Sequence, residues 1–331
     1  MGSACAQFRT LAFALRLLQA ALFVAIGLVF CLSPAMAQPV ADCPPAPKTI
    51  TPELYAAAAE QVQDRGFVWR IRKGGHSSFL YGTLHVGRKA WLAPGPLLQA
   101  ALRDSTTLAL ELDPLDPAVG AAFGEVLARE PVRSIAPSLK ARLLRQLRLQ
   151  CMSIEMIFQL PAELVLANLS LAMARRDALD PTFGSETVLA QMAHARGVPV
   201  VSLETAEVQM NAVLAADAAE AQHFLEDGLR EMESGHARES LLELVTMWET
   251  GNVELLDTYE QWCECVVTAT EKLQMRRLVD ERNPAMARKI DALHQAGEQV
   301  LAAIGSLHMA GPRGLPALLA QMGYTVERLS P

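Results

Sequence analysis

Short apolar runs near both ends of the chain predict strands, whereas the middle follows a helical pattern. Residues 67–72 and 78–85 alternate like two strands around a Gly74-Gly75 turn and predict a hairpin. Residues 106–112 form a short apolar run that predicts a buried strand, which Asp113-Pro114 ends. Three further strands are expected at residues 198–203, 300–304 and 324–329.

The middle of the chain predicts helices. From about residue 117 to 178, apolar residues recur at spacings of three and four, as in the stripe Leu139, Leu143, Leu144 and Leu147. These elements predict an α/β fold: one domain with a mixed central sheet flanked by helices and a long α-helical insertion at about residues 117–280. Helices are also expected at residues 94–104, 185–196, 206–280, 315–322 and 284–296, the last with Asn283 as its cap.

The first 37 residues predict a signal peptide. Arg9 and Arg16 precede an apolar stretch at residues 17–32, and Ala35-Met36-Ala37 matches a cleavage signal. A membrane span needs about 20 apolar residues, so cleavage is favoured over an uncleaved membrane anchor. We therefore expect an exported, periplasmic protein. Its proline-rich linker is expected at residues 38–53 and its α/β domain at residues 54–331.

The composition excludes several classes of protein. The chain has 331 residues, of which 51% are hydrophobic and 20% charged, and a formal net charge of -7. An acidic protein without a basic stripe is unsuited to nucleic acid, because phosphate binding needs clustered Lys and Arg. No segment after the signal peptide predicts an integral membrane span. The motifs of serine hydrolases, P-loop proteins and dinucleotide-binding proteins are absent from the sequence.

Signal cleavage would remove two of the six cysteines and leave four. In an oxidising compartment four cysteines allow two disulfides with three possible connectivities. Cys263 and Cys265 are separated by one residue, so each is expected to pair with a distant partner, and a metal site is the less favoured alternative. The four cysteines are Cys43, Cys151, Cys263 and Cys265.

Two segments of the sequence are similar to each other. Residues 80–87 (LYGTLHVG) and 303–311 (AIGSLHMAG) both place an apolar strand before Gly-[Thr/Ser]-Leu-His. Ligands of open α/β sheets bind outside the carboxyl ends of strands. His85 and His308 would meet there if their strands are neighbours, and two imidazoles suit a divalent metal. The same pocket is expected to contain Gly82, Thr83, Gly305 and Ser306.

Four polar residues complete the candidate site. Glu111 interrupts an apolar run, where a lone carboxylate is costly to bury; it is either a metal ligand or general base, or the partner of Arg282 in a structural salt bridge. Glu204 either joins the site or starts a helix. Arg282 and Asn283 either orient a substrate or serve as a solvated side chain and a helix cap. Surface or packing roles are expected for His76, His194, His223, His236 and His294.

Taken in order, these motifs resemble the TraB/GumN family, which is similar to the Tiki metalloproteases. The matching blocks include FLYGTLHVG, ALELD, PVVSLET, ERNPAMA and IGSLHMAGPRGLPALLAQMGYTVERL. The resemblance implies a fold related to ChaN-like and erythromycin-esterase-like proteins and a divalent-metal hydrolase site. His85, Glu111, His308 and the Arg282-Asn283 pair fall on matching positions. Many members have G-[IL]-D where this chain has Gly184-Ser185-Glu186, which puts a polar role in the pocket there in doubt.

Two functions remain open at this point. The first is a metal-dependent hydrolase, with a peptidase as one option, acting on a peptide or small-molecule amide or ester with a Mn, Co, Zn or Fe ion. The second is a non-catalytic periplasmic binding or accessory protein for envelope, polysaccharide or peptide-signal processes. The sequence fixes neither the metal, the substrate nor the oligomeric state.

Overall fold

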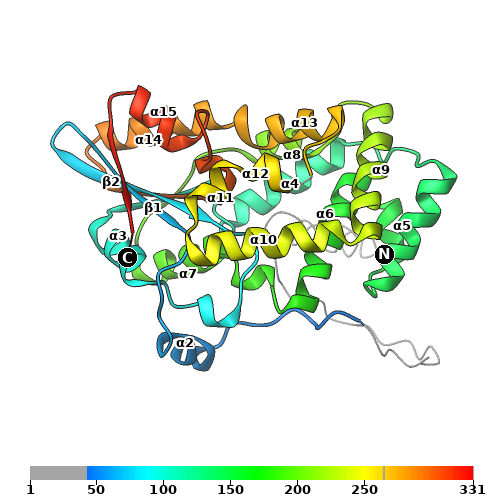
Figure 1. Cartoon of the computed structure of the whole chain (residues 1–331), viewed down its shortest axis with the longest axis horizontal. Helices are drawn as coiled ribbons and strands as arrows, with labels where there is room; N and C mark the ends of the chain where they lie inside the picture. Colours follow the sequence, from blue (N-terminus) through cyan, green and yellow to red (C-terminus); the bar gives the residue numbers. More distant parts are fainter. Residues whose placement is uncertain (1–42, 264, 331) are drawn as a thin grey trace, which may run out of the picture.

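A computed structural model describes residues 43–263 and 265–330; the signal peptide predicted at residues 1–37 lies outside this range. Six strands form one mixed sheet in the order β4-β3-β5-β2-β1-β6. Helices flank this sheet and extend well beyond it (Figure 1). The predicted α/β fold with a mixed central sheet is confirmed.

Four strands of the sheet, β4, β3, β5 and β2, run parallel, whereas β1 is antiparallel to both β2 and β6. The strand predicted at residues 106–112 already ends at Leu110, so Glu111 follows the strand rather than lying inside it. The strands are β1 (Phe67–Lys73), β2 (His76–Thr83), β3 (Thr107–Leu110), β4 (Val200–Ser202), β5 (Val300–Gly305) and β6 (Thr325–Leu329).

The helices lie on the two faces of the sheet and beyond one end of it. Figure 1 shows α14 and α15 along one side and α7 along the other. No helix in residues 43–263 and 265–330 is long and apolar enough to cross a bilayer. The helices are α2 (Pro52–Ala59), α3 (Pro96–Asp104), α4 (Pro117–Arg129), α5 (Pro137–Leu149), α6 (Ala162–Ala174), α7 (Ser185–Arg196), α8 (Ala206–Val213), α9 (Ala218–Ser234), α10 (His236–Thr250), α11 (Val253–Asp257), α12 (Tyr259–Trp262), α13 (Ala269–Met275), α14 (Asn283–Gln295) and α15 (Leu315–Gln321).

The long helical region predicted at residues 206–280 is divided into separate helices. Gly235 and Gly251 end α9 and α10 in the left-handed backbone region, with φ of 89° and 62°. Glycine reaches this conformation without the penalty of a Cβ, which makes it a common helix terminator. The chain can therefore fold back on itself and pack its helices side by side.

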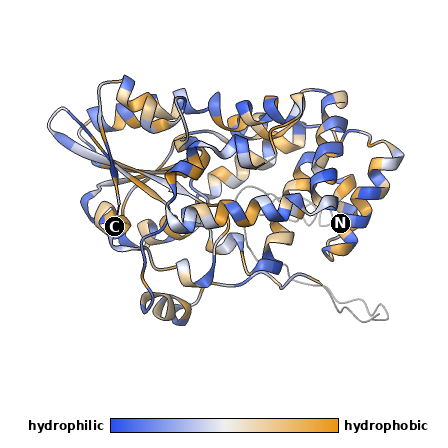
Figure 2. Cartoon of the chain, viewed as in Figure 1, coloured by the Kyte–Doolittle hydropathy of each residue, from blue (hydrophilic) through white to orange (hydrophobic). Residues whose placement is uncertain are grey.

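The two largest hydrophobic clusters among the described residues fill most of the interior. One lies around the sheet and contains Leu80, Leu108 and Leu301. The other lies among α4, α5, α6, α8 and α9 and includes Leu143 and Leu164. Figure 2 shows both hydrophobic and hydrophilic residues along these helices, as expected for amphipathic helices around a core. The helical region is thus organised by its own apolar contacts.

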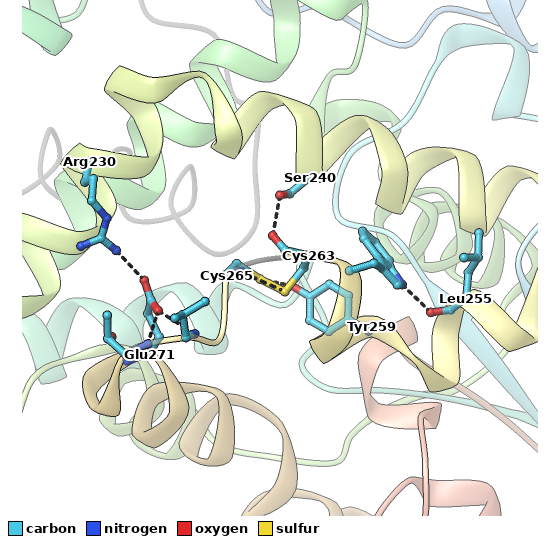
Figure 3. The surroundings of a disulfide bond; sticks show 10 residues. Arg230, Ser240, Leu255, Tyr259, Cys263, Cys265 and Glu271 are labelled. Atoms are coloured by element: carbon cyan, nitrogen blue, oxygen red, sulfur yellow. Dashed lines mark hydrogen bonds and ion pairs between the residues drawn. A yellow bond between two sulfur atoms is a disulfide. The ribbon is translucent and has the colours of Figure 1, made fainter.

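Both disulfides link cysteines that the sequence left without assigned partners. Cys43 pairs with Cys151, 108 residues further along the chain. Cys263 pairs with Cys265, so the expectation that each of them reaches a distant partner was wrong. The turn after α12 brings their Cα atoms within 5.1 Å, inside the usual range of about 4.4–6.8 Å. Figure 3 shows this bridge beside Tyr259, whose hydroxyl lies 3.1 Å from Cys265 Sγ.

Candidate functional site

The carboxyl ends of the four parallel strands bring the predicted site residues to one edge of the sheet. His85 follows β2, Glu111 follows β3 and Glu204 follows β4. His308 follows β5, in the short 3-10 helix η6 (Ser306–Met309). Because β5 lies between β2 and β3, the two histidines come from adjacent strands, which is the condition under which the sequence expected them to meet.

Three of these side chains surround Gly305. A Cβ built on Gly305 would lie 3.2 Å from Glu111 Oε1, 3.6 Å from His308 Cδ2 and 3.8 Å from His85 Nε2. A larger residue would press on the carboxylate and both rings, so glycine leaves the space that they share. Thr83 pairs with Gly305 across the sheet, which aligns the two Gly-x-x-His segments.

The Glu111 carboxylate is buried and held from three directions. Its Oε1 accepts a hydrogen bond from the Gly305 N–H at 2.9 Å. Its Oε2 accepts from Arg282 Nη2 at 2.5 Å and from Gln209 Nε2 at 3.1 Å. Burial by itself raises the pKa of Glu111, but Arg282, His308, His85 and the Gly305 N–H together lower it to about 2. Glu111 is therefore an anion at neutral pH.

Arg282 joins Glu111 to Glu204. Its Nε donates to Glu204 Oε1 at 2.9 Å, and its Nη2 donates to both carboxylates. Burial opposes the charge of Arg282, but the hydrogen bonds and charges of the two carboxylates raise its pKa. The two roles considered for Glu111 are therefore compatible. The residue forms a buried salt bridge with Arg282, and it also lies beside the two histidines.

A π-helical turn, η5 (Arg276–Asp280), precedes Arg282. In this turn the Glu281 N–H donates to the Arg276 carbonyl, five residues earlier. The Leu278 carbonyl accepts from Arg282 Nη1 at 2.7 Å, which fixes the guanidinium against its own helix. Isolated π turns often lie at functional sites, and this one sets the direction of Arg282.

His308 is buried and held in a single tautomer. The Asn283 amide donates from Nδ2 to the Arg313 carbonyl at 2.8 Å, so its Oδ1 accepts from His308 Nδ1 at 2.6 Å. Burial away from water lowers the pKa of His308 to about 4, so the ring is neutral and its Nε2 carries a lone pair. Asn283 is the first residue of α14, not its cap; that prediction was wrong because the amide is engaged by tertiary contacts.

His85 lies at the opening of the site. Its side chain is 58% exposed, and its Nδ1 lies 2.6 Å from Oε1 of Glu186, which is 7% exposed. The Glu186 carboxylate raises the pKa of His85. The other oxygen of Glu186 is buried without a hydrogen-bond partner among the described residues. Glu186 thus has the polar role that its departure from the family motif had put in doubt.

The small residues of the two motifs join the strands to each other. The Ser306 hydroxyl donates to the Thr83 carbonyl at 2.8 Å and so ties the end of β5 to the end of β2. The Gly82 carbonyl accepts from the Trp248 indole at 2.8 Å. A Cβ on Gly82 would lie 3.0 Å from Ser306 Oγ. These residues therefore fix the backbone beneath the histidines.

The buried cluster has more negative than positive charge. Glu111 and Glu204 supply two carboxylates, and Arg282 supplies one guanidinium. His308 adds no charge because it is neutral at pH 7. One surplus negative charge remains in a poorly solvated place, where charges need a counterion. The arrangement favours a cation at the shared point beside Gly305.

The donor atoms suit a divalent metal in type, but they are not fully assembled as a coordination sphere. No group of three His, Cys, Asp or Glu side chains within residues 43–263 and 265–330 is close enough to hold a metal. His308 Nε2 and Glu111 Oε1 lie 4.0 Å apart, whereas two ligands of a tetrahedral zinc lie about 3.4 Å apart. The neutral imidazole of His308, the Glu111 carboxylate and the surplus negative charge nevertheless match what such an ion needs, and His85 would join them by releasing its proton as the ion binds.

Glu186 and Gln209 are two site residues that sequence reasoning did not assign. Gln209 Nε2 donates to Glu111 at 3.1 Å and lies 3.4 Å from Glu204 Oε2. Gln209 belongs to the PVVSLET…Q block, which is the one signal that pointed toward it. Glu186 lies on α7, 101 residues from His85, and no local pattern links the two.

Two histidines outside the site pack against the sheet. His194 Nε2 lies 2.7 Å from Asp113 Oδ2, just past β3. His294 Nδ1 accepts from the Ser78 hydroxyl of β2 at 2.8 Å. Both contacts are packing contacts that join a helix to the sheet. Asp113 also accepts from the Leu115 N–H, as expected of a turn residue.

Comparison with known proteins gives one family. A model of the TraB/PrgY/gumN family matches residues 67–328, which is most of the chain. No curated protein and no solved structure gives a significant match.

Proposed function

Because the chain belongs to the TraB/PrgY/gumN family, we propose that it is a metal-dependent hydrolase, of the peptidase type, in which His85, His308 and Glu111 hold a divalent cation. One observation carries the proposal. Each histidine uses Nδ1 for a hydrogen bond, to Glu186 or to Asn283. The other nitrogens face the shared space: His85 Nε2 would lie 3.8 Å from a Cβ on Gly305, and His308 Nε2 lies 4.0 Å from Glu111 Oε1. Metal-binding histidines are typically oriented in this way by a carboxylate or amide on the other nitrogen.

Each protein residue has a distinct part in the proposed reaction. A bound Mn, Co, Zn or Fe ion would polarise the scissile carbonyl and make water a better nucleophile. Glu111, ionised at neutral pH, would either bind the ion or accept the proton of the attacking water. Arg282 acts through Glu111, because its donors are used by two carboxylates and the Leu278 carbonyl. Asn283 keeps His308 in the tautomer whose Nε2 is free to bind.

The first experiment measures metal content. Residues 38–331 are purified with and without the His85→Ala/His308→Ala substitutions and analysed for bound metal after addition of Mn, Co and Zn. His223→Ala is the control, because His223 is an exposed histidine on α9. We expect one equivalent of metal in the wild type and the control, and none in the double variant. Equal metal in all three proteins would refute the site.

A hydrolysis screen separates the enzyme from its alternative. The metal-loaded protein is incubated with peptide and ester libraries, beside Glu111→Gln. Metal binding with hydrolysis that Glu111→Gln abolishes supports the hydrolase. Metal binding without turnover of any substrate, together with selective retention of an envelope protein, supports the non-catalytic binding or accessory protein.

We also propose that the chain is exported to the periplasm. The predicted signal peptide and the two disulfides support this, because disulfides persist in oxidising compartments. Cell fractionation with thiol labelling tests the proposal. A cytoplasmic protein with four reactive thiols would contradict it, and an unprocessed, membrane-bound chain would support the uncleaved anchor.

A further inference from the structure

A cavity of about 260 Å³ lies between three segments next to the candidate site. Its walls come from α11 and α12, from the end of α13 with η5, and from the loop that follows His308. Pockets that enclose drug-sized ligands measure about 300–1,000 Å³. This cavity therefore has room for one long side chain or a similarly small group.

The walls combine an apolar interior with acidic groups. Leu256, Val279 and Leu307 line the cavity, and Leu256 is fully buried. Asp257 and Glu260 also line it, and both belong to exposed positions of the chain. A hydrocarbon stem with a positive end suits such surroundings, because long cationic side chains bury their methylene groups and keep the charge near polar atoms.

The side chain of Arg313 already places one cationic group in this cavity. Asp280 lines the cavity, and its carboxylate lies 2.6 Å from the guanidinium of Arg313. The Arg313 side chain is 62% exposed, so it can leave toward solvent at little cost. This internal ion pair shows which chemistry Asp280 accepts: a guanidinium or an ammonium group.

The cavity shares two of its walls with the candidate site. Leu307 directly precedes His308. The Arg313 carbonyl accepts from Asn283, the residue that orients His308. Asp280 is two residues before Arg282. A side chain in the cavity would therefore belong to a molecule that passes close to His308 and Arg282.

We propose that this cavity binds the cationic side chain of a lysine or arginine in a peptide substrate, displacing Arg313 from Asp280. The substrate class rests on the proposed hydrolase function, but the binding step does not. Counting the lining charges, three carboxylates face one guanidinium, so an anionic group is disfavoured. An uncharged side chain would fill the apolar part but gain no attraction from Asp257, Glu260 and Asp280.

Direct binding tests the pocket without turnover. The full chain is titrated with Nα-acetyl-lysine methylamide and with the norleucine analogue, which has a similar stem without the charge. We expect the lysine compound to bind about tenfold more tightly, a difference of about 1.4 kcal/mol. Equal affinity for the two compounds would overturn the proposal.

Matched substitutions locate the binding. Asp257→Asn/Glu260→Gln should weaken lysine binding about tenfold, since two of the three carboxylates that line the cavity lose their charge. Glu254→Gln is the control, because Glu254 is an exposed acid of α11 outside the cavity. Arg313→Ala should strengthen binding severalfold by removing the competing guanidinium. Unchanged affinity in both cavity variants, with normal thermal unfolding, would place the ligand elsewhere.

Two further measurements separate this inference from the proposed function. The His85→Ala/His308→Ala protein should still bind the lysine compound, since these residues do not line the cavity. In a peptide library, the wild type should cleave next to Lys or Arg, and Asp257→Asn/Glu260→Gln should lose that preference. Binding without cleavage would refute the hydrolase function and support the lysine pocket. Cleavage without a preference for basic residues would refute the lysine pocket and support the hydrolase function.

Discussion

Strands β2 and β5 have a pair of histidines at each end, and the two pairs are built differently. At the carboxyl end, His85 and His308 each use Nδ1 for one hydrogen bond and direct the other side of the ring toward Gly305 and Glu111. At the amino end, His76 stacks on His294 with ring centroids 3.7 Å apart. Both pairs consist of histidine side chains, but their hydrogen bonds give the two pairs different chemistry.

The amino-end pair is satisfied by the protein itself. His294 Nε2 donates to the Lys73 carbonyl at 2.9 Å, and its Nδ1 accepts from Ser78 at 2.8 Å. His76 Nε2 lies 2.8 Å from the His294 carbonyl, which it reaches as a donor. No nitrogen of the His294 ring is left for a ligand. A histidine pair is thus a candidate metal site only where one nitrogen of each ring stays open.

Removing the positive charge of Arg282, at the carboxyl end of the parallel strands, should have the largest effect on stability. Arg282→Met would leave Glu111 and Glu204 buried without a counterion, and we expect a loss of about 3–5 kcal/mol in the free energy of unfolding. Urea denaturation at pH 7.5 without added metal measures it. Arg142→Met is the control, because Arg142 pairs with Glu226 and Glu233 on the surface of the helical region. It should cost about 1 kcal/mol or less; equal losses would contradict a special role for the buried cluster.

At the amino end, His294→Ala should destabilise the fold without affecting metal. The substitution leaves the Lys73 carbonyl and the Ser78 hydroxyl without their buried partner and removes the stacking on His76. We expect a loss of about 2–3 kcal/mol, measured by urea denaturation, with the wild-type metal content. A metal-free His294→Ala protein that is folded would show that the two ends are not independent.

Orientation of the open histidine nitrogen should matter by a smaller amount. Glu186→Gln removes the carboxylate that faces His85 Nδ1 and should weaken metal binding about 10–100-fold. Isothermal titration with the metal that the wild type binds gives the affinity. Asp113→Asn is the matched control, because Asp113 pairs with His194 at 2.7 Å outside the site. If both variants bind metal equally well, the Glu186 contact does not tune the site.

The smallest expected effect is a dependence of stability on pH. Burial lowers the pKa of His294, and an unfolded histidine titrates near about 6.5. Below that pH the unfolded chain binds the proton first, so stability falls as the pH falls from about 6.5 toward the lower pKa of the folded state. Lys73, Asp291, Tyr324 and His76 surround the ring and stay in place in the test.

Unfolding midpoints at pH 7.5 and 5.5 check this expectation. The decrease should be smaller in His294→Gln than in the wild type, since glutamine does not titrate. His223→Gln, on the exposed face of α9, should leave the decrease unchanged. A decrease of the same size in His294→Gln would mean that other groups carry the dependence.

The sequence was most informative where a pattern repeats or has a fixed period. The two Gly-x-x-His segments predicted histidines that meet if their strands are neighbours, and Thr83 does pair with Gly305. The apolar runs predicted the strands because a buried strand needs apolar residues on both faces. These features are written in local stretches of the chain and can be found without knowledge of contacts.

Features that depend on distant contacts were missed or misassigned. Asn283 fits the rule for a helix cap, but His308 and Arg313 take up its amide instead. Glu186 reaches His85 across 101 residues. Cys263 and Cys265 were judged too close to pair, but the chain turns between α12 and α13 and brings them together. Local rules describe what a residue can do, and the folded chain decides which option is used.

The π turn before Arg282 also has a rotational consequence. Each residue of an α-helix advances the chain by about 100° around the axis. The extra residue in η5 therefore rotates Arg282 by about a quarter turn relative to α13, which packs on α9 through Thr268 and Asp227. The guanidinium therefore points in a direction that differs by this angle from the one an uninterrupted α-helix would give it. Deleting one residue of η5 would keep the packing of α13 on α9 but turn the guanidinium away from both carboxylates.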